Sequence, residues 1–281
     1  MNYFDAHVHC IWTGPFENVL KSWQALANQG LRGFSALIKV NAPKEPERYL
    51  QLNPAAYHQE LDAGFIQHGS STHPAVARGF GGLDVCPYLD CRYLSKTDAD
   101  LSAFVSQGFK GLKILYVPEE DEGMKVVGWR KYFGRSWAES EAVVWSLINQ
   151  AVQLRWPVLM HVNLKSYREL AEDVLATYPD HPFQIPHFGL SRKIMAGFLE
   201  RFSTCYTDFA SLLPQMRENS RGYRDYITSF QDRILFGTDT TLGHPEWVLE
   251  YRNAFMELIS DEAVQDKVLR TNYLGFHGQK D

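Results

Sequence analysis

The sequence has few cysteines and no long apolar run, and both absences narrow what this chain can be. Its four cysteines, Cys10, Cys86, Cys91 and Cys205, are too few and too scattered in 281 residues for a disulfide framework. The longest apolar runs, such as 157–160, are far shorter than the roughly 20 residues that cross a bilayer. We therefore expect free thiols and no membrane-spanning segment.

An excess of positive charge is also absent. Lys and Arg number 28 against 33 Asp and Glu, and the net charge of -5 gives no electrostatic reason to bind nucleic acid or an anionic membrane. The first residues lack the basic and apolar regions of a signal peptide, so we expect a cytoplasmic protein. The expected partner is a small-molecule substrate, and a homodimer is one assembly that the sequence permits.

Short apolar runs alternate with stretches of helical periodicity along the whole chain. The expected strands are 3–9, 33–40, 75–85, 110–116, 157–162, 183–188, 203–209 and 233–238. The expected helices are 16–29, 49–67, 97–107, 139–155, 166–178, 191–201, 215–230, 245–258 and 261–270. Eight alternations predict an α/β fold, a closed parallel (β/α)8 barrel, for which about 250 residues is typical. A doubly wound sheet is the second choice, because no G-x-G-x-x-G follows the first strand.

No linker divides the chain, so we expect one domain over residues 1–281. The segment 117–138 is the longest stretch without clear periodicity, and it follows the expected fourth strand. In a barrel this places it on the C-terminal face, where active sites are built. It is expected to be a lid or a subunit-interface insertion, with a solvated loop as the alternative.

The first expected strand ends in Asp5-Ala6-His7-Val8-His9. Because side chains alternate along a strand, both histidines should project to the same side of the sheet. Imidazole is a common ligand of zinc and neighbouring metals, and Asp5 on the same face could orient a ligand from beneath. A structural role for an isolated H-x-H is the alternative.

Three further strands end in residues of the same chemistry. His161 follows Pro-Val-Leu-Met, His187 follows Gln-Ile-Pro, and Asp239 ends Arg-Ile-Leu-Phe-Gly-Thr-Asp. In a barrel these ends lie on the face that carries active sites, so the side chains should converge. For any one of them, a hydrogen bond to the backbone is the alternative role.

The chain resembles the amidohydrolase superfamily, in particular the amidohydrolase-related branch that contains aminocarboxymuconate semialdehyde decarboxylase and lactone hydrolases. The motifs that carry the resemblance are D-A-H-V-H (5–9), G-F-K-G-L-K (108–113), P-V-L-M-H (157–161), P-H-F-G (186–189), Y-T-D-F (206–209) and R-I-L-F-G-T-D (233–239). The resemblance implies that His7, His9, His161 and Asp239 hold one divalent metal ion, zinc in preference to manganese. It also implies that His187 hydrogen-bonds the water at the metal.

Other strand-end residues are candidates for binding the substrate. Lys113 could orient a substrate carboxylate, pair with a buried aspartate, or be carboxylated and bridge two metals as in binuclear relatives. Lys39 could bind an anionic substrate, with a solvated strand end as the alternative. Asn163 stands where the branch often has Gly, and it is a further candidate. Asp208 could support His187 or the metal ligands, or be a buried carboxylate without a catalytic part.

These residues predict a metal-dependent hydrolase that acts on an amide or a lactone of a small, carboxylate-bearing substrate. Water at the metal supplies the nucleophile, His187 or the metal stabilises the oxyanion, and Asp239 moves the proton to the leaving group. The enzymatic alternative is nonoxidative decarboxylation of an unsaturated or aromatic acid. The alternative outside catalysis is an inactive, metal-binding scaffold.

Overall fold

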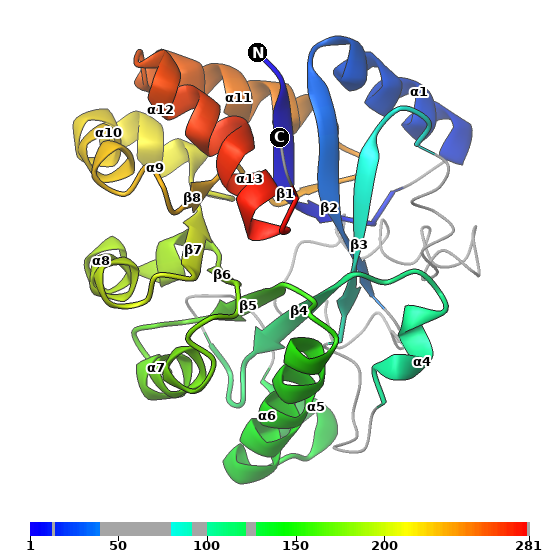
Figure 1. Ribbon diagram of the computed structural model, residues 1–281, viewed down its shortest axis with the longest axis vertical. Coiled ribbons are helices and arrows are strands. Elements are labelled where there is room, and N and C mark those ends of the chain that lie inside the picture. Colours follow the sequence, from blue (N-terminus) through cyan, green and yellow to red (C-terminus); the bar gives the residue numbers. More distant parts are fainter. Residues whose placement is uncertain (13–14, 40–79, 92–99, 122–127, 280–281) are drawn as a thin grey trace.

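The strands of the computed structural model form one parallel sheet that curls into a barrel (Figure 1). The structure describes residues 1–12, 15–39, 80–91, 100–121 and 128–279, without the side chains of 132 and 133. The strands are β1 (Tyr3–His9), β2 (Leu31–Lys39), β3 (Asp84–Asp90), β4 (Gly111–Tyr116), β5 (Val158–Val162), β6 (Phe183–Ile185), β7 (Cys205–Asp208), β8 (Ile234–Leu235) and β9 (Thr240–Thr241). Their order in the sheet is β8-β7-β6-β5-β4-β3-β2-β1-β9.

Helices surround the sheet (Figure 1). They are α1 (Phe16–Asn28), α4 (Ser102–Val105), α5 (Trp129–Phe133), α6 (Trp137–Gln153), α7 (Arg168–Thr177), α8 (Arg192–Arg201), α9 (Leu213–Glu218), α10 (Ser220–Ser229), α11 (Glu246–Leu258), α12 (Glu262–Asp266) and α13 (Asn272–Phe276). Short turns η2 (His187–Leu190) and η3 (Lys267–Thr271) complete the described elements. In the described part of the chain, no helix is long and apolar enough to cross a membrane.

Hydrogen bonds between β1 and the last strand segments close the barrel. β8 and β9 are two pieces of one strand, interrupted at Asp239, where φ is 61°. Across the interruption the amide of Ala6 donates to Phe236 O at 2.8 Å, and the amide of Asp239 donates to His7 O at 2.9 Å. Val8 then pairs with Thr240 in parallel register. The predicted (β/α)8 barrel is confirmed, with an eighth strand that is broken beside the first.

The third strand differs from the prediction. It spans Asp84–Asp90, whereas the expected strand was 75–85, of which residues 75–79 lie outside the described part of the chain. Pro87 lies in the middle of β3, and a proline lacks the amide hydrogen that a central strand requires, so this segment did not resemble a strand. β3 nevertheless pairs with β2 through seven residue pairs and with β4 through three.

Two helical segments near the C-terminus also differ. The expected helix 215–230 is divided into α9 and α10 at Asn219, whose side chain accepts a hydrogen bond from the Gly222 amide and caps α10. The last expected helix, 261–270, continues through η3 to Phe276. The expected helix 49–67 and part of the expected helix 97–107 lie outside the described residues.

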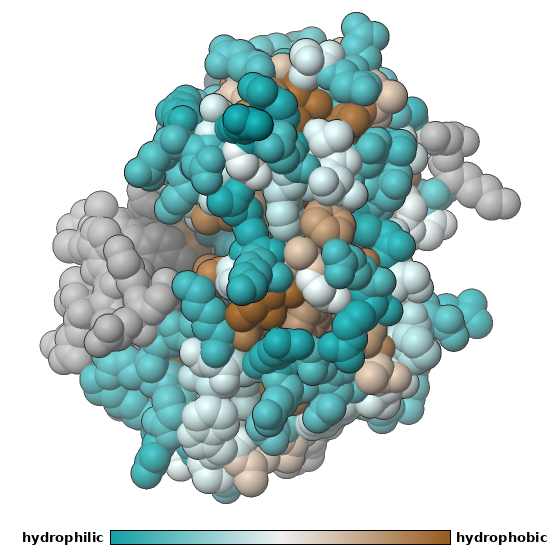
Figure 2. All heavy atoms as spheres, turned by 90° about the vertical axis from the view of Figure 1, so that its left-hand side faces the viewer, coloured by the Kyte–Doolittle hydropathy of each residue, from teal (hydrophilic) through white to brown (hydrophobic). Residues whose placement is uncertain are grey.

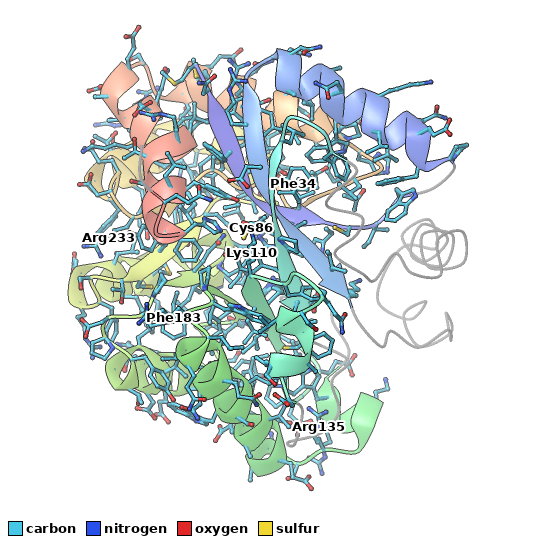
Figure 3. All side chains as sticks on the ribbon, turned by 45° about the vertical axis from the view of Figure 1, so that its right-hand side comes forward. Phe34, Cys86, Lys110, Arg135, Phe183 and Arg233 are labelled. Carbon is cyan, nitrogen blue, oxygen red and sulfur yellow. The ribbon has the colours of Figure 1, made fainter. Side chains whose placement is uncertain are left out.

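The apolar outer face of the sheet packs against the helices. Phe34 projects from β2 toward α1, where its ring centroid lies 4.5 Å from that of Trp23 (Figure 3). Both side chains are fully buried. The Trp23 indole N–H donates to Leu242 O at 3.0 Å, so α1 is also joined to the chain that follows β9. This packing joins α1 both to β2 and to the segment that follows β9.

The C-terminal helix covers the opposite, N-terminal mouth (Figure 1). Tyr273 stacks on Phe4 at a centroid distance of 4.7 Å, and Phe276 packs into the same buried cluster. His277 Nε2 lies 3.0 Å from the Tyr88 hydroxyl, and its Nδ1 donates to Tyr273 O at 2.8 Å. Burial lowers the pKa of His277 to about 4 despite that backbone hydrogen bond. The neutral imidazole is therefore a packed part of the closure.

We expect His277 to make the fold sensitive to acid. A histidine with a pKa of about 4 when folded and about 6.5 when unfolded contributes stability above pH 6.5, which is lost as the pH falls toward 4. The expected loss is at most about 3.5 kcal/mol, from about 1.4 kcal/mol per pKa unit. Urea unfolding between pH 4.5 and 8 should show a flatter profile for His277→Gln than for the wild type. Parallel profiles for the two proteins would contradict this role.

Candidate active site

The end of β1 and the break in the last strand bring two imidazoles and a carboxylate together. His9 Nε2 lies 2.9 Å from Asp239 Oδ1, and His7 Nε2 lies 3.2 Å from the same oxygen. The histidines share an orientation because alternate residues of a strand face the same side. Asp239 reaches them from a left-handed backbone position that its amide hydrogen bond to His7 O fixes. The three donor atoms form a compact group at the C-terminal mouth.

This group has the spacing of ligands around one metal ion. Donors held about 2.0 to 2.2 Å from an ion lie about 3 to 3.6 Å from one another, depending on the coordination geometry. His7 Nε2 is buried and, among the described residues, has no hydrogen-bond partner. Its Nδ1 faces the Asp208 carboxylate and so carries the proton. A buried lone pair that faces a carboxylate oxygen is unfavourable without a cation between them, so these residues fit a divalent metal ion.

Asp208, at the end of β7, organises the group from below. Its carboxylate is fully buried and accepts hydrogen bonds from His7 Nδ1 at 3.2 Å and from Gln184 Nε2 at 2.6 Å. It also accepts from the amides of His187 at 2.8 Å and Ala210 at 3.1 Å. Burial would raise the pKa of Asp208, but His7 and His187 outweigh it and lower the pKa to about 2. An ionised Asp208 thus orients His7 and positions the backbone of His187.

His187 begins a turn with left-handed backbone conformation. The φ values of His187, Phe188, Gly189 and Leu190 are 56°, 50°, 59° and 60°. Such positions are costly for residues other than glycine and are found at functional sites. His187 Nδ1 donates to Ala210 O at 2.8 Å, which leaves the lone pair on Nε2. The His187 ring lies 5.2 Å from the His7 ring. This lone pair is therefore held beside the cluster of His7, His9 and Asp239, the candidate metal-ligand group.

His161 lies beside this group at the end of β5. Its ring centroid is 4.6 Å from that of His187, and its buried Nε2 has no hydrogen-bond partner in the described part of the chain. Burial lowers the pKa of His161 well below the usual range, and His187 and Lys113 lower it further. The imidazole is therefore neutral at pH 7. Among the described residues, however, His161 belongs to no set of three donors that lie within 4.8 Å of one another.

Asp5 joins β1 to the broken strand. Its carboxylate accepts hydrogen bonds from the His7 amide at 3.0 Å, the Thr238 amide at 3.1 Å and the Thr238 hydroxyl at 2.6 Å. Burial raises the pKa of Asp5 to about 7 against the effect of these hydrogen bonds. Asp5 therefore contacts the backbone of His7 and leaves the His7 imidazole to Asp208.

A row of buried charges crosses the neighbouring strands. Lys39 on β2, Asp90 on β3 and Lys113 on β4 are partners in register, and their exposed fractions are 3%, 0% and 0%. The row consists of two lysines and one aspartate between them. After the effect of burial, the charge of Lys113 is a further cause that lowers the pKa of His7. The row therefore lies close enough to the group to influence it electrostatically.

Asn163 lies at the edge of the site. Its Nδ2 donates to Asp121 Oδ2 at 2.9 Å, and its Oδ1 accepts from the Lys165 amide at 3.0 Å. Asp121 lies in the segment 117–138, whose residues 122–127 are outside the described part. The described end of that segment forms α5, so the expected lid or interface insertion remains a prediction.

Several residues of this region were not predicted from the sequence. Asp90 was not predicted because the third strand was misplaced. A correct assignment of that strand would have placed the Asp90 carboxylate at its C-terminal end. Ser211 donates to Asp239 Oδ2 at 2.6 Å from a loop that carries no motif. Gln184 lies two residues before Pro186, and only the alternation of side chains along β6 could have indicated that it faces the interior.

Comparisons with known proteins relate the chain to one family and its fold to solved structures. A family model described as amidohydrolase matches residues 4–272. Dihydroorotase from Saccharomyces cerevisiae, solved with 5-fluoroorotic acid, has a TM-score of 0.62 at 8% identity and covers 100% of this chain and 85% of its own. A probable 2-pyrone-4,6-dicarboxylic acid hydrolase from Acinetobacter baumannii, solved with citric acid, has a TM-score of 0.54 at 14% identity. The match covers 99% of this chain and 100% of the hydrolase chain. The comparison with curated proteins found no match.

We expect His9→Ala to lose metal, because it removes one of the three clustered donors. The apparent affinity for zinc should fall by at least about 100-fold, the upper end of what loss of an outer-shell partner usually costs. His244→Ala is the matched control, since His244 is exposed and pairs with Glu246. Elemental analysis and zinc titration of both variants test this. Unchanged zinc affinity in His9→Ala would show that zinc binds elsewhere.

Proposed function

Because the chain belongs to the amidohydrolase family, we propose that it is a metal-dependent hydrolase that attacks an amide or lactone carbonyl of a small, carboxylate-bearing substrate. The ligands would be His7, His9, His161 and Asp239, and the ion would be one zinc, with manganese as the alternative. The observation that carries the proposal is the buried convergence of His7 Nε2 and His9 Nε2 on Asp239 Oδ1. A bound divalent ion would supply a water of lowered pKa and would polarise the carbonyl oxygen.

The protonation states of the surrounding groups suit this chemistry. Burial lowers the pKa of His7 and His161, so both imidazoles are neutral ligands at pH 7. Burial would raise the pKa of Asp239, but His7 and His9 outweigh it and hold the pKa well below the usual range. Asp239 is thus ionised at neutral pH and able to accept a proton. Because its conjugate acid is strong, it would return that proton readily to a leaving group.

His187 would act at the reacting carbonyl. Its Nδ1 proton is engaged by Ala210 O, so Nε2 is the atom available to a water or to the substrate. The Asp208 carboxylate holds the His187 amide, and the hydrogen bond from Nδ1 to Ala210 O holds the orientation of the ring. This rigidity would keep the imidazole within hydrogen-bond reach of the reaction centre, as an acid-base group requires.

The buried row of charges supports a carboxylate on the substrate. Lys39 and Lys113 would provide the positive charge, with Asp90 between them in register. The ligands named for two similar structures, 5-fluoroorotic acid and citric acid, are both carboxylic acids. At 8% and 14% identity these neighbours establish the fold alone, so the substrate class rests on the charges of this chain.

A panel of substrates tests the reaction. Zinc-loaded protein should be incubated with lactones, amides and unsaturated carboxylic acids, and the products followed by mass and by carbon dioxide release. A product heavier than the substrate by one water, with a new carboxylate, supports hydrolysis. Loss of carbon dioxide from the acids without hydrolysis of the lactones or amides would replace this proposal with decarboxylation.

We expect Asp239→Asn to be inactive even where it retains metal. The amide oxygen can still coordinate an ion, but the amide cannot accept and return a proton. Loss of general acid-base catalysis typically lowers kcat by about 10²- to 10⁴-fold. Ser211→Ala is the control, because it removes a hydrogen bond to the same carboxylate and leaves its charge in place. Metal content and kcat should be measured on the same preparations.

The comparison of the two variants separates the roles of Asp239. A metal-replete Asp239→Asn protein with nearly wild-type kcat would leave Asp239 as a ligand only. The proton transfer would then pass to His187, and His187→Gln should show the larger loss of kcat at full metal occupancy.

A further inference from the structure

A cavity of about 410 Å³ lies next to His187 on the C-terminal side of the barrel. Its walls come from the loops that follow β5, β6 and β7 and from α8, α9 and α10, and they include Asn163, His187, Arg192 and Tyr223. His187 therefore borders the metal-ligand group on one side and the cavity on the other. The volume falls within the roughly 300 to 1,000 Å³ of small-molecule sites.

The charges around the cavity have one sign. Lys165 and Arg192 line it, and no Asp or Glu is among the described residues that line it. Within the described residues, no ion pair joins either cation to a carboxylate, whereas Arg168 and Arg201 on the neighbouring surface both pair with Glu172. Two cations facing a cavity without an acid attract an anion.

Arg192 is held in place by an aromatic ring. Its Cζ lies 3.9 Å from the centroid of Tyr223, which is a close cation–π contact. A guanidinium stacked in this way is restricted in orientation and presents its edge N–H groups, which match a planar carboxylate. The stacking therefore orients the Arg192 guanidinium for an anion even when no anion is bound.

The remaining walls are partly apolar. Phe188, Leu190 and Leu212 line the cavity beside the two cations. Figure 2 shows the side of the molecule on which α8 and α10 lie, where apolar atoms occupy a recess framed by hydrophilic side chains. A ligand that suits these walls has an apolar or aromatic body and one carboxylate.

We propose that this cavity binds a further carboxylate of the substrate, distinct from the one proposed for the buried row of charges. This carboxylate lies on an apolar or aromatic part remote from the bond that reacts, and Arg192 and Lys165 select for it. Arg192 pairs with the carboxylate, Lys165 adds positive charge at the rim, and the leucine side chains contact the apolar body. The inference rests on the proposed function only in treating this anion as part of the substrate. Anion binding in the cavity does not itself require metal or turnover.

Benzoate and its uncharged analogue benzamide test the cavity. Isothermal titration of the zinc-loaded protein should show tighter binding of benzoate than of benzamide. Arg192→Ala should weaken benzoate about 10-fold or more, since a hydrogen bond to a charged group contributes about 1.5 to 3 kcal/mol. The affinity of Arg192→Ala for benzamide should stay within about 2-fold of the wild-type value. Lys165→Ala, on an exposed side chain, is a second variant with the same expected direction and a smaller effect.

The matched control is Lys193→Ala, which removes the same charge from the next residue of α8, an exposed position that does not line the cavity. It should bind benzoate like the wild type. Equal benzoate affinity in the wild type, Arg192→Ala and Lys165→Ala would overturn the proposal, because the carboxylate would then bind at the metal or elsewhere. Metal content and hydrolysis are measured separately, so a failure of the hydrolase proposal is distinguishable from a failure of the cavity.

Discussion

The closure of the barrel between its first strand and its broken last strand is the constraint on which the rest of the site depends. The carboxylate of Asp5 accepts hydrogen bonds from Thr238, next to the break in the last strand, and from the His7 amide in β1. The Asp239 amide donates to His7 O in the same region. These bonds set the register of β1 against the last strand. A shift of one residue would turn His7 and His9 away from the mouth, because side chains alternate along a strand.

Asp208 carries the same constraint across the barrel to β6 and β7. One buried carboxylate receives the His7 imidazole, the Gln184 amide and the His187 backbone. Removal of any one donor would leave the carboxylate less stabilised in a buried site, which is costly. The orientation of the metal-ligand group and that of His187 are therefore not independent. One residue at the end of β7 therefore sets the orientation of both His7 and His187.

The sequence predicted the barrel and the strand-end histidines because their signals are local. H-x-H on a strand, or a histidine after four apolar residues, requires only alternation and the parallel topology to be placed. Asp90 was missed because Pro87 concealed its strand. The left-handed turn at His187 depends on hydrogen bonds to residues 21 and 23 positions away, and the strand break at Asp239 on a bond to His7, 232 positions away. No local pattern reports such bonds. The cavity beside His187 was missed for the same reason, since its walls come from four separate segments.

The left-handed turn at His187–Leu190 limits how far the barrel can be stabilised. Each residue other than glycine in this conformation costs about 1 to 2 kcal/mol, so His187, Phe188 and Leu190 are positions where glycine would relieve strain. Yet these three side chains line the cavity, and His187 also faces the metal-ligand group. Substitution by glycine would relieve the backbone strain, but it would also remove the side chains that line the cavity. Variants selected only for heat resistance should therefore accumulate substitutions in this turn at the expense of substrate selection.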